Sequence, residues 1–348
     1  MSLPEQPPAA PRANVVPHLI WEAVLLLAAV AVTILAVTNG HFLDARNPLW
    51  QQLGLTGFVA SGFALSLRAG TPNLAVGSAA LLAGTVYAKA GVSGWPAPAA
   101  AAVAVLAATG LGLFLAVIAG LTGLPAWSVS LVGLPIGFTV TLALTNGSTI
   151  AVRDATISRG PLEALTVLFV LTSVAGALLW LVPGVRSIRF TAQPGGAAPG
   201  AGQRMAAALV GLAGSSLLAG LAGALTTGYL RTSSPAGTDQ FDLLVAVAAV
   251  LLGGASITRR SFGIAGTVLA VYLFLVVENQ LIIHNNPVWK AEYLPVSVAI
   301  VVGLLAGWLL DLLGNLFRAT PSYPVPPGAG PMVPPPYAVT PQQPAAPG

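Results

Sequence analysis

The chain has 348 residues, of which 55% are hydrophobic and only 7% are charged, and its mean hydropathy is +0.84. Soluble domains carry about 25% charged residues, so this composition excludes a water-soluble fold and indicates a polytopic membrane protein. The sequence contains no cysteine, which excludes a disulfide framework, thiol catalysis and cysteine-based metal sites. The net charge of +4 comes from scattered basic residues, which do not form the basic stripe of a nucleic-acid-binding protein.

Apolar segments follow one another along most of the chain, and about 20 such residues cross a hydrocarbon core. The sequence therefore predicts an all-α bundle of about ten transmembrane segments, some of them broken or re-entrant. The fifth segment is bounded or interrupted by Pro125 and Pro135, and the eighth is short, as expected inside a bundle. In chain order the segments are Leu19–Thr38, Trp50–Leu67, Leu74–Ala90, Ala97–Leu121, Trp127–Thr145, Leu162–Val182, Met205–Thr227, Leu243–Ile257, Phe262–Ile283 and Tyr293–Leu313.

The two ends of the chain differ from this apolar middle. Residues 1–18 are rich in Pro and Ala and lack the charged n-region and cleavage site of a signal peptide, so the first span is expected to remain. Residues 319–348 form a Pro-rich tail that is expected to be disordered, with a docking peptide as the alternative. Basic residues favour a cytoplasmic location for both termini. The segments placed inside by that orientation hold Arg12, Arg68, Arg186, Arg189, Arg204, Arg259, Arg260 and Arg318.

The most informative stretch is residues 70–78, where Gly70, Pro72 and Gly77 interrupt two apolar segments around a single Asn73. Backbone that leaves the helix at membrane depth persists only where protein or a water-filled cavity satisfies its polar groups. Broken helices of this kind are a recurring way to build a translocation path. The Asn73 amide has a structural alternative, which is to cap the broken helix.

Four motifs in order resemble one family. Residues 73–78 (Asn-Leu-Ala-Val-Gly-Ser) and 235–256 (ending Leu-Leu-Gly-Gly-Ala-Ser) resemble signatures of permease subunits of the ribose and branched-chain amino acid group of ABC importers. The Gly-rich stretch 259–267 and the polar helix end 277–282 also follow the family's order. Asn73 stands where the sugar permeases usually carry Asp. The resemblance covers most of residues 50–315.

The resemblance implies a membrane-spanning permease domain over residues 19–318 that works by alternating access. It implies an ATPase subunit that binds ATP, a second permease subunit (identical or similar), an extracellular substrate-binding protein and a small polar solute. A ribose-type monosaccharide is the first candidate for this solute, followed by nucleosides and branched-chain amino acids. The expected substrate path is lined by Asn73, Ser78, Glu278, Asn279 and Gln280. The protein is expected in the bacterial cell membrane.

The same resemblance places the ATPase contact in residues 189–204, at Arg189, Gln193, Pro194 and Arg204. In these permeases the segment holds a short coupling helix. Here its Pro and Gly content disfavours a helix, and the acidic residue that usually precedes the paired alanines is missing. The sequence predicts a functional transporter with a divergent contact.

Residues for covalent chemistry are missing from the sequence. Neither lysine lies in a phosphate-binding Gly-rich loop, so ATP hydrolysis by this chain is not expected, and neither is a cofactor. The three histidines, His18, His41 and His284, are isolated and show no metal-ligand spacing, so no metal site and no catalytic residues are predicted.

Ionisable residues within the apolar segments are costly and often functional. Glu22 and Asp311 lie near segment ends and are expected to reach water. Glu278 lies about one turn from the outer end of its segment, where either an interhelical hydrogen-bond cluster or a solute path would explain it. An ion-coupled secondary transporter built around Glu278 is one alternative function, and a membrane scaffold that docks through the Pro-rich tail is another.

Overall fold

The computed structural model describes residues 16–38, 42–152, 159–179, 182–186, 188, 190, 198–235, 238–255, 264–283 and 293–316. These residues are almost entirely helical, which confirms the all-α prediction. The elements are α1 (Val16–Thr38), α2 (Phe42–Ala69), α3 (Val76–Val92), α4 (Ala97–Thr122), α5 (Ala126–Thr145), β1 (Ile150–Ala151), α6 (Arg159–Leu179), α7 (Pro183–Arg186), α8 (Ala201–Ala208), η1 (a π-helix, Leu209–Ala213), α9 (Gly214–Leu230), β2 (Thr232–Ser233), α10 (Thr238–Leu252), α11 (Gly266–Ile283) and α12 (Tyr293–Leu316).

Each predicted transmembrane segment overlaps a helix among the described residues. Among the described residues, five helices are long and apolar enough to cross a membrane: α1, α4, α5, the continuous unit α8–η1–α9, and α12. Apolar parts of α3, α6, α10 and α11 form shorter helices, as expected of segments packed inside a bundle. Pro135 lies inside a continuous α5 rather than ending it. The predicted N-terminal segment lies outside the described residues up to position 15, and the predicted tail lies wholly outside them.

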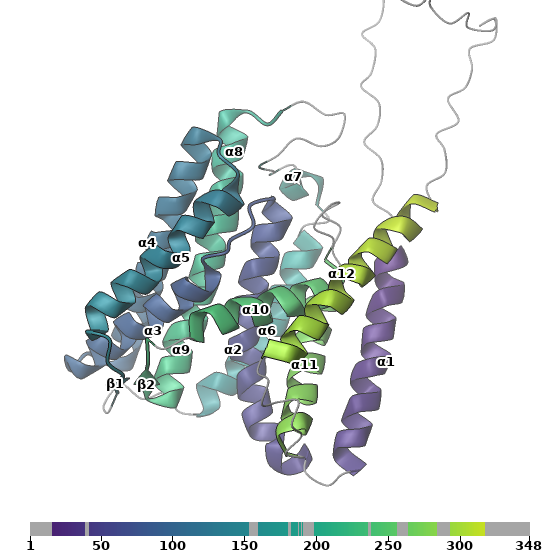
Figure 1. Cartoon of the computed structure of the whole chain (residues 1–348), viewed down its shortest axis with the longest axis horizontal. Coiled ribbons are helices and arrows are strands. Elements are labelled where there is room, and N and C mark those ends of the chain that lie inside the picture. The colour runs from purple at the N-terminus through teal and green to yellow at the C-terminus, as the bar shows by residue number, and fades with distance from the viewer. Residues whose placement is uncertain are drawn as a thin grey trace, which may run out of the picture.

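The helices form two groups that both pack on α2 (Figure 1) and that also meet directly where α10 packs against α3. In one group α3 packs against α9, α4 and α5, and β1 pairs antiparallel with β2 beside it. In the other group α10 packs against α12, and α1 packs against α11. Helix α2 contacts members of both groups, and α6 lies against it. The first turns of α1 and the last turns of α12 lie on the same side, because Trp21 and Leu310 both lie next to Gly254.

Helix α2 is the central element. Its apolar character is too weak for it to count among the five long spans, yet nearly all of its described residues are buried. Glycines permit close packing on several sides: a Cβ at Gly57 would meet the ring of Phe169, and one at Gly62 would meet the carbonyl oxygen of Ser215 at 2.8 Å. A helix enclosed by protein does not have to match the lipid, which explains its polar positions, such as buried Gln51.

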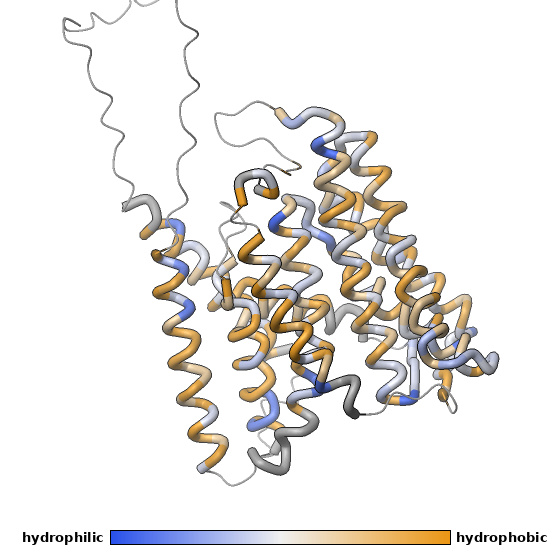
Figure 2. Tube along the Cα trace, turned by 180° about the vertical axis from the view of Figure 1, so that it is seen from behind, coloured by the Kyte–Doolittle hydropathy of each residue, from blue (hydrophilic) through white to orange (hydrophobic). Residues whose placement is uncertain are grey.

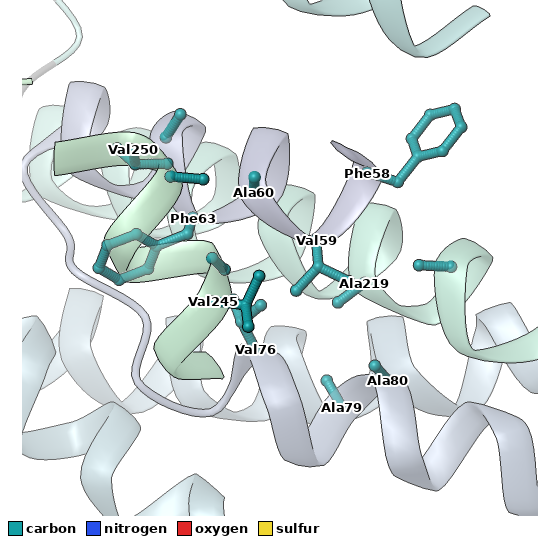
Figure 3. Packing of buried hydrophobic residues seen from close by; sticks show 14 of the residues in the cluster. Phe58, Val59, Ala60, Phe63, Val76, Ala79, Ala80, Ala219, Val245 and Val250 are labelled. Carbon is teal, nitrogen blue, oxygen red and sulfur yellow. The ribbon is translucent and has the colours of Figure 1, made fainter. Parts of the chain in front are cut away.

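The hydrophobic core lies where α2 meets α3, α9 and α10. Val59, Val76 and Val245 gather there from three helices (Figure 3). Phe58 points away from this centre and packs against Phe169 of α6, with ring centroids 6.4 Å apart. Many core positions hold alanine, which lets the helix backbones approach closely.

The outer helices expose their apolar side chains. Leu27 of α1, Leu106 of α4 and Trp308 of α12 are each more than three-fifths exposed. Figure 2 shows hydrophobic residues along most of each outer helix, with strongly hydrophilic residues mainly near helix ends. Such exposed apolar surface suits contact with lipid rather than water. The chain is a multi-pass membrane protein.

Candidate functional site

The segment Gly70–Ala75, here called the α2–α3 break, joins the end of α2 to the start of α3. Gly70 has φ +75°, its N–H donates to the carbonyl of Leu67 (3.0 Å), and the N–H of Thr71 donates to the carbonyl of Ser66 (2.9 Å). This is a Schellman ending, which requires a left-handed residue that glycine adopts without strain. The predicted interruption of the helix at Gly70 is therefore present.

Asn73 lies at the centre of the break and is fully buried. Its Nδ2 donates to the Oγ of Ser215 (2.7 Å), the Oγ of Ser216 (3.1 Å) and the carbonyl of Leu212 (3.3 Å). Its Oδ1 accepts from the N–H of Ala75 (3.0 Å), an Asx turn that leads into α3. The Asn73 amide is thus used on both sides by the protein itself, which favours the structural alternative for this residue in this conformation.

Serines of α2 and α5 bind three further backbone groups of the break. Ser66 of α2 accepts from the N–H of Asn73 (3.1 Å). Ser130 of α5 accepts from the N–H of Leu74 (3.0 Å) and donates to the carbonyl of Pro72 (3.0 Å). Every side chain in this network is neutral. Non-helical backbone is stable here because protein groups replace the missing helical hydrogen bonds.

The π-helix η1 lies opposite the break. A π-helical turn widens the backbone and often marks a functional region of a helix. The carbonyl of Leu212 in this turn accepts from Ser215 and from Asn73. Gly211 leaves room for Thr71, since a Cβ at Gly211 would collide with the Thr71 hydroxyl. The break and η1 are therefore complementary in shape and in hydrogen bonding.

The other predicted residues of the break lie close by. Pro72 is part of it, whereas Gly77 lies in the first turn of α3. Ser78, also in α3, is buried, and its hydroxyl donates to the carbonyls of Ala75 (3.1 Å) and Gly133 (3.4 Å). Ser78 therefore joins α3 to α5.

The predicted path residues of α11 lie elsewhere. Glu278, Asn279 and Gln280 are half-buried in a helix that packs mainly against α1, α2 and α10. Glu278 lies about 18 Å along α11 from Gly266. Asn73, by contrast, contacts η1 and α9. The structure does not bring the two predicted groups into one cluster.

The predicted ATPase contact is described only in part, because Arg189, Gln193 and Pro194 lie outside the described residues. Arg204 lies in α8, which begins at Ala201, so the last residues of the predicted contact are helical even though the sequence disfavours a helix there. The Arg204 guanidinium lies against Gly123 at the end of α4. At the other end of the predicted contact, the N–H of Phe190, the residue after Arg189, donates to the carbonyl of Ala69 (3.2 Å), directly before the break.

The expectation that Glu22 reaches water is wrong. Its side chain is buried, and its Oε1 accepts from the N–H groups of Ala265 (2.7 Å) and Gly266 (3.0 Å).

Sequence reasoning also missed Ser130, Ser215 and Ser216. Hydroxyls inside otherwise apolar segments are a usable signal for such residues, because buried polar groups need partners. Within the described part of the chain, no three His, Cys, Asp or Glu side chains are grouped to hold a metal.

Comparison with known proteins identifies the family. Residues 49–305 match the family described as the permease component of branched-chain amino acid transport systems. The chain is 29% identical over 263 residues to the probable ABC transporter permease protein y4mJ of Sinorhizobium fredii (strain NBRC 101917 / NGR234), which covers 69% of this chain and 75% of that relative. No solved structure matches the chain. With its broken helix inside a multi-pass bundle and a family match over most of its length, the chain belongs to this family of permease subunits of ABC transporters.

Proposed function

We propose that the chain is the membrane-spanning subunit of an ATP-driven importer that carries a small polar solute across the bacterial cell membrane by alternating access. The observation that carries the proposal is the α2–α3 break, whose neighbours along the chain and in space connect to both ends of the predicted ATPase-contact segment. Phe190 follows Arg189 and bonds to Ala69, while α8, which holds Arg204, runs directly into η1. A movement of that segment can therefore reach the break through the last residue of α2 on one side and through η1 on the other.

Neutral hydrogen bonds suit a break that must change its arrangement during transport. The bonds of Asn73 and Ser130 join helices α2, α3, α5 and α9, and each has a net value of about 1 kcal/mol, so they exchange at modest cost. In the alternating-access cycle, ATP binding in a partner subunit shifts the balance between two arrangements of these helices. Opening the network would free the Asn73 amide and the Ser78 hydroxyl for solute.

The same chemistry supports the proposed substrate class. The side chains around the break are hydroxyls and one amide, which donate and accept hydrogen bonds without carrying charge. A neutral polyhydroxylated solute matches such groups, whereas the charged ends of an amino acid call for charged partners. A ribose-type monosaccharide therefore remains the leading candidate, with nucleosides and branched-chain amino acids behind it. Glu278, Asn279 and Gln280 remain candidates for the outer part of the path.

The proposal includes three partners: an ATPase subunit, a second permease subunit and a substrate-binding protein on the outer side. Arg68 lies in the last turn of α2, where its charge interacts with Glu22, on the side where α1 begins and α12 ends. The excess of basic residues on that side favours a cytoplasmic location for it and for both termini.

The test begins with purification of the tagged chain from its native membrane in a mild detergent, followed by mass spectrometry of the proteins that accompany it. We expect a stoichiometric ATPase subunit. The complex is then reconstituted into vesicles, and uptake of radiolabelled ribose, a nucleoside and leucine is compared with and without ATP.

Uptake of ribose that requires ATP supports the proposal, and vesicles with a hydrolysis-deficient ATPase are the control. A chain that purifies alone, and takes up solute when only a sodium or proton gradient is applied, contradicts it. ATP-driven uptake of leucine but not ribose would keep the importer and overturn the sugar assignment.

A further inference from the structure

A second interruption separates α10 from α11. Helix α10 ends in another Schellman arrangement: Gly254 has φ +83°, its N–H donates to the carbonyl of Leu251 (2.9 Å), and the N–H of Ala255 donates to that of Val250 (3.2 Å). The two ends of the interruption touch, because a Cβ at Gly266 would collide with the carbonyl of Gly253. The end of α10 and the start of α11 therefore form one compact unit.

Two adjacent residues of α1 bind both ends of this interruption. The indole Nε1 of Trp21 donates to the carbonyl of Leu252, the last residue of α10 (2.8 Å). The carboxylate of Glu22 accepts from the N–H groups of Ala265 and Gly266, where α11 begins (2.7 and 3.0 Å). We call Trp21 and Glu22 the α1 clamp.

Each clamp contact meets a need of a helix end. The last carbonyls and the first N–H groups of a helix lack partners within the helix, and the positive end of the helix dipole favours a carboxylate. Hydrogen bonds to a charged group are worth about 1.5–3 kcal/mol, more than neutral ones, so Glu22 is the stronger half of the clamp.

Among the described residues, few other contacts hold α1 to the rest of the bundle. Most of its side chains face outward, and its main neighbour is α11. A further polar contact, between the Thr33 hydroxyl and the Tyr272 hydroxyl (2.8 Å), joins the two helices. Because the hydrophobic effect drives little association between helices in lipid, close packing and interhelical hydrogen bonds such as these hold α1 in place.

We propose that Trp21 and Glu22 are positioning residues that make α1, α10 and α11 move as one body, relative to the group around α3 and α9, when the permease changes access. This inference rests on the proposed transport function. The charge of Glu22 also acts on Arg68 at the end of α2, directly before the α2–α3 break. The α1 clamp therefore lies where a movement of α1, α10 and α11 would reach the central helix, α2.

Hydrogen exchange tests the clamp without any transport assay. In the purified full chain, Glu22→Ala is expected to speed amide exchange in the peptide that contains residues 265 and 266 by about tenfold, because both N–H groups lose a charged acceptor. Glu22→Gln, which keeps an acceptor oxygen, should restore most of the protection. Glu163→Ala, at an exposed acid of α6, is the matched control. Unchanged exchange in Glu22→Ala overturns the clamp.

Cross-linking tests the joint movement, and the natural chain, which has no cysteine, is a suitable background. Thr33→Cys with Tyr272→Cys, joined by a short bifunctional thiol reagent, should keep ATP-driven uptake near the wild-type rate, because the two helices do not separate. The single-cysteine variants treated with the same reagent are the controls. Loss of uptake only in the cross-linked pair overturns the proposal.

The failure of the two proposals is distinguishable. If the unmodified complex shows no ATP-driven uptake, the transport proposal fails, and the exchange result still decides whether Glu22 holds α11. If uptake is normal and Glu22→Ala transports at the wild-type rate with unchanged exchange, only the clamp fails.

Discussion

The two helix interruptions end in the same way but are held differently. Both begin with a Schellman ending at a left-handed glycine, Gly70 in one and Gly254 in the other. Beyond that point, the α2–α3 break uses an amide from its own segment, Asn73, and hydroxyls from the surrounding helices. The α10–α11 interruption uses an indole and a carboxylate from α1, more than 200 residues away in the chain.

The difference follows from position in the bundle. The α2–α3 break is enclosed by α5, η1 and α9, where an unpaired charge would be costly, and all of its side-chain partners are neutral. The α10–α11 interruption lies beside the first turns of α1, where the charge of Arg68 interacts with the Glu22 carboxylate. Charge is tolerated where opposite charge is available. Substitutions at the two interruptions should therefore lower the stability of the protein by different amounts.

The largest effect is expected at Gly266. In Gly266→Val the new side chain meets the backbone of Gly253, which cannot move aside cheaply, so we expect a loss of more than about 3 kcal/mol in stability. The measurement is the yield of monodisperse protein in size-exclusion chromatography. Gly110→Val is the control, since nothing lies within 4 Å of a Cβ at that exposed position of α4. Equal yields from the two variants would contradict a close approach of α10 and α11.

Asn73→Leu is expected to come next. Leucine has the same branching but is larger, and it leaves the carbonyl of Leu212 and the N–H of Ala75 without these partners, at a cost of about 2–4 kcal/mol. Thermal unfolding in detergent, followed by intrinsic tryptophan fluorescence, measures the loss. An unchanged unfolding temperature would show that the neutral network does not hold the α2–α3 break.

Ser130→Ala tests the contribution of α5 to the same break. It removes the acceptor for the N–H of Leu74 and the donor to the carbonyl of Pro72, so we expect a loss of about 1–2 kcal/mol. Ser93→Ala serves for comparison, because the Ser93 hydroxyl bonds only locally at the exposed end of α3. Similar unfolding temperatures for both variants would count against the role of Ser130.

The smallest effect is expected for Trp21→Phe. Phenylalanine keeps most of the packing but loses the hydrogen bond to Leu252, which is worth about 1 kcal/mol. The unfolding temperature is compared with that of Trp127→Phe, at an exposed tryptophan of α5. A loss larger than that of Asn73→Leu would reverse the proposed order and make the α10–α11 interruption the more sensitive of the two.

The sequence by itself determined the class of the protein, the approximate position of its helices and the α2–α3 break, because hydropathy, glycine and proline act locally. It also led to the family through short motifs. It did not reveal the π-helix, since the widened turn at Leu209–Ala213 contains no residue that demands it. Arg204 in α8 shows the same limit: a Pro- and Gly-rich segment disfavours a helix, yet the helix begins within its last residues.

Only the tertiary structure decided which polar groups meet. Asn73 was visible in the sequence, but its partners Ser215 and Ser216 lie more than 140 residues further on. From its position near a segment end, Glu22 was predicted to reach water, whereas the packing of α1 on α11 buries it at the start of a helix. The physical reason is the same in both cases: a buried polar group must find a partner, and the packing of helices distant in the chain determines which partner is within reach.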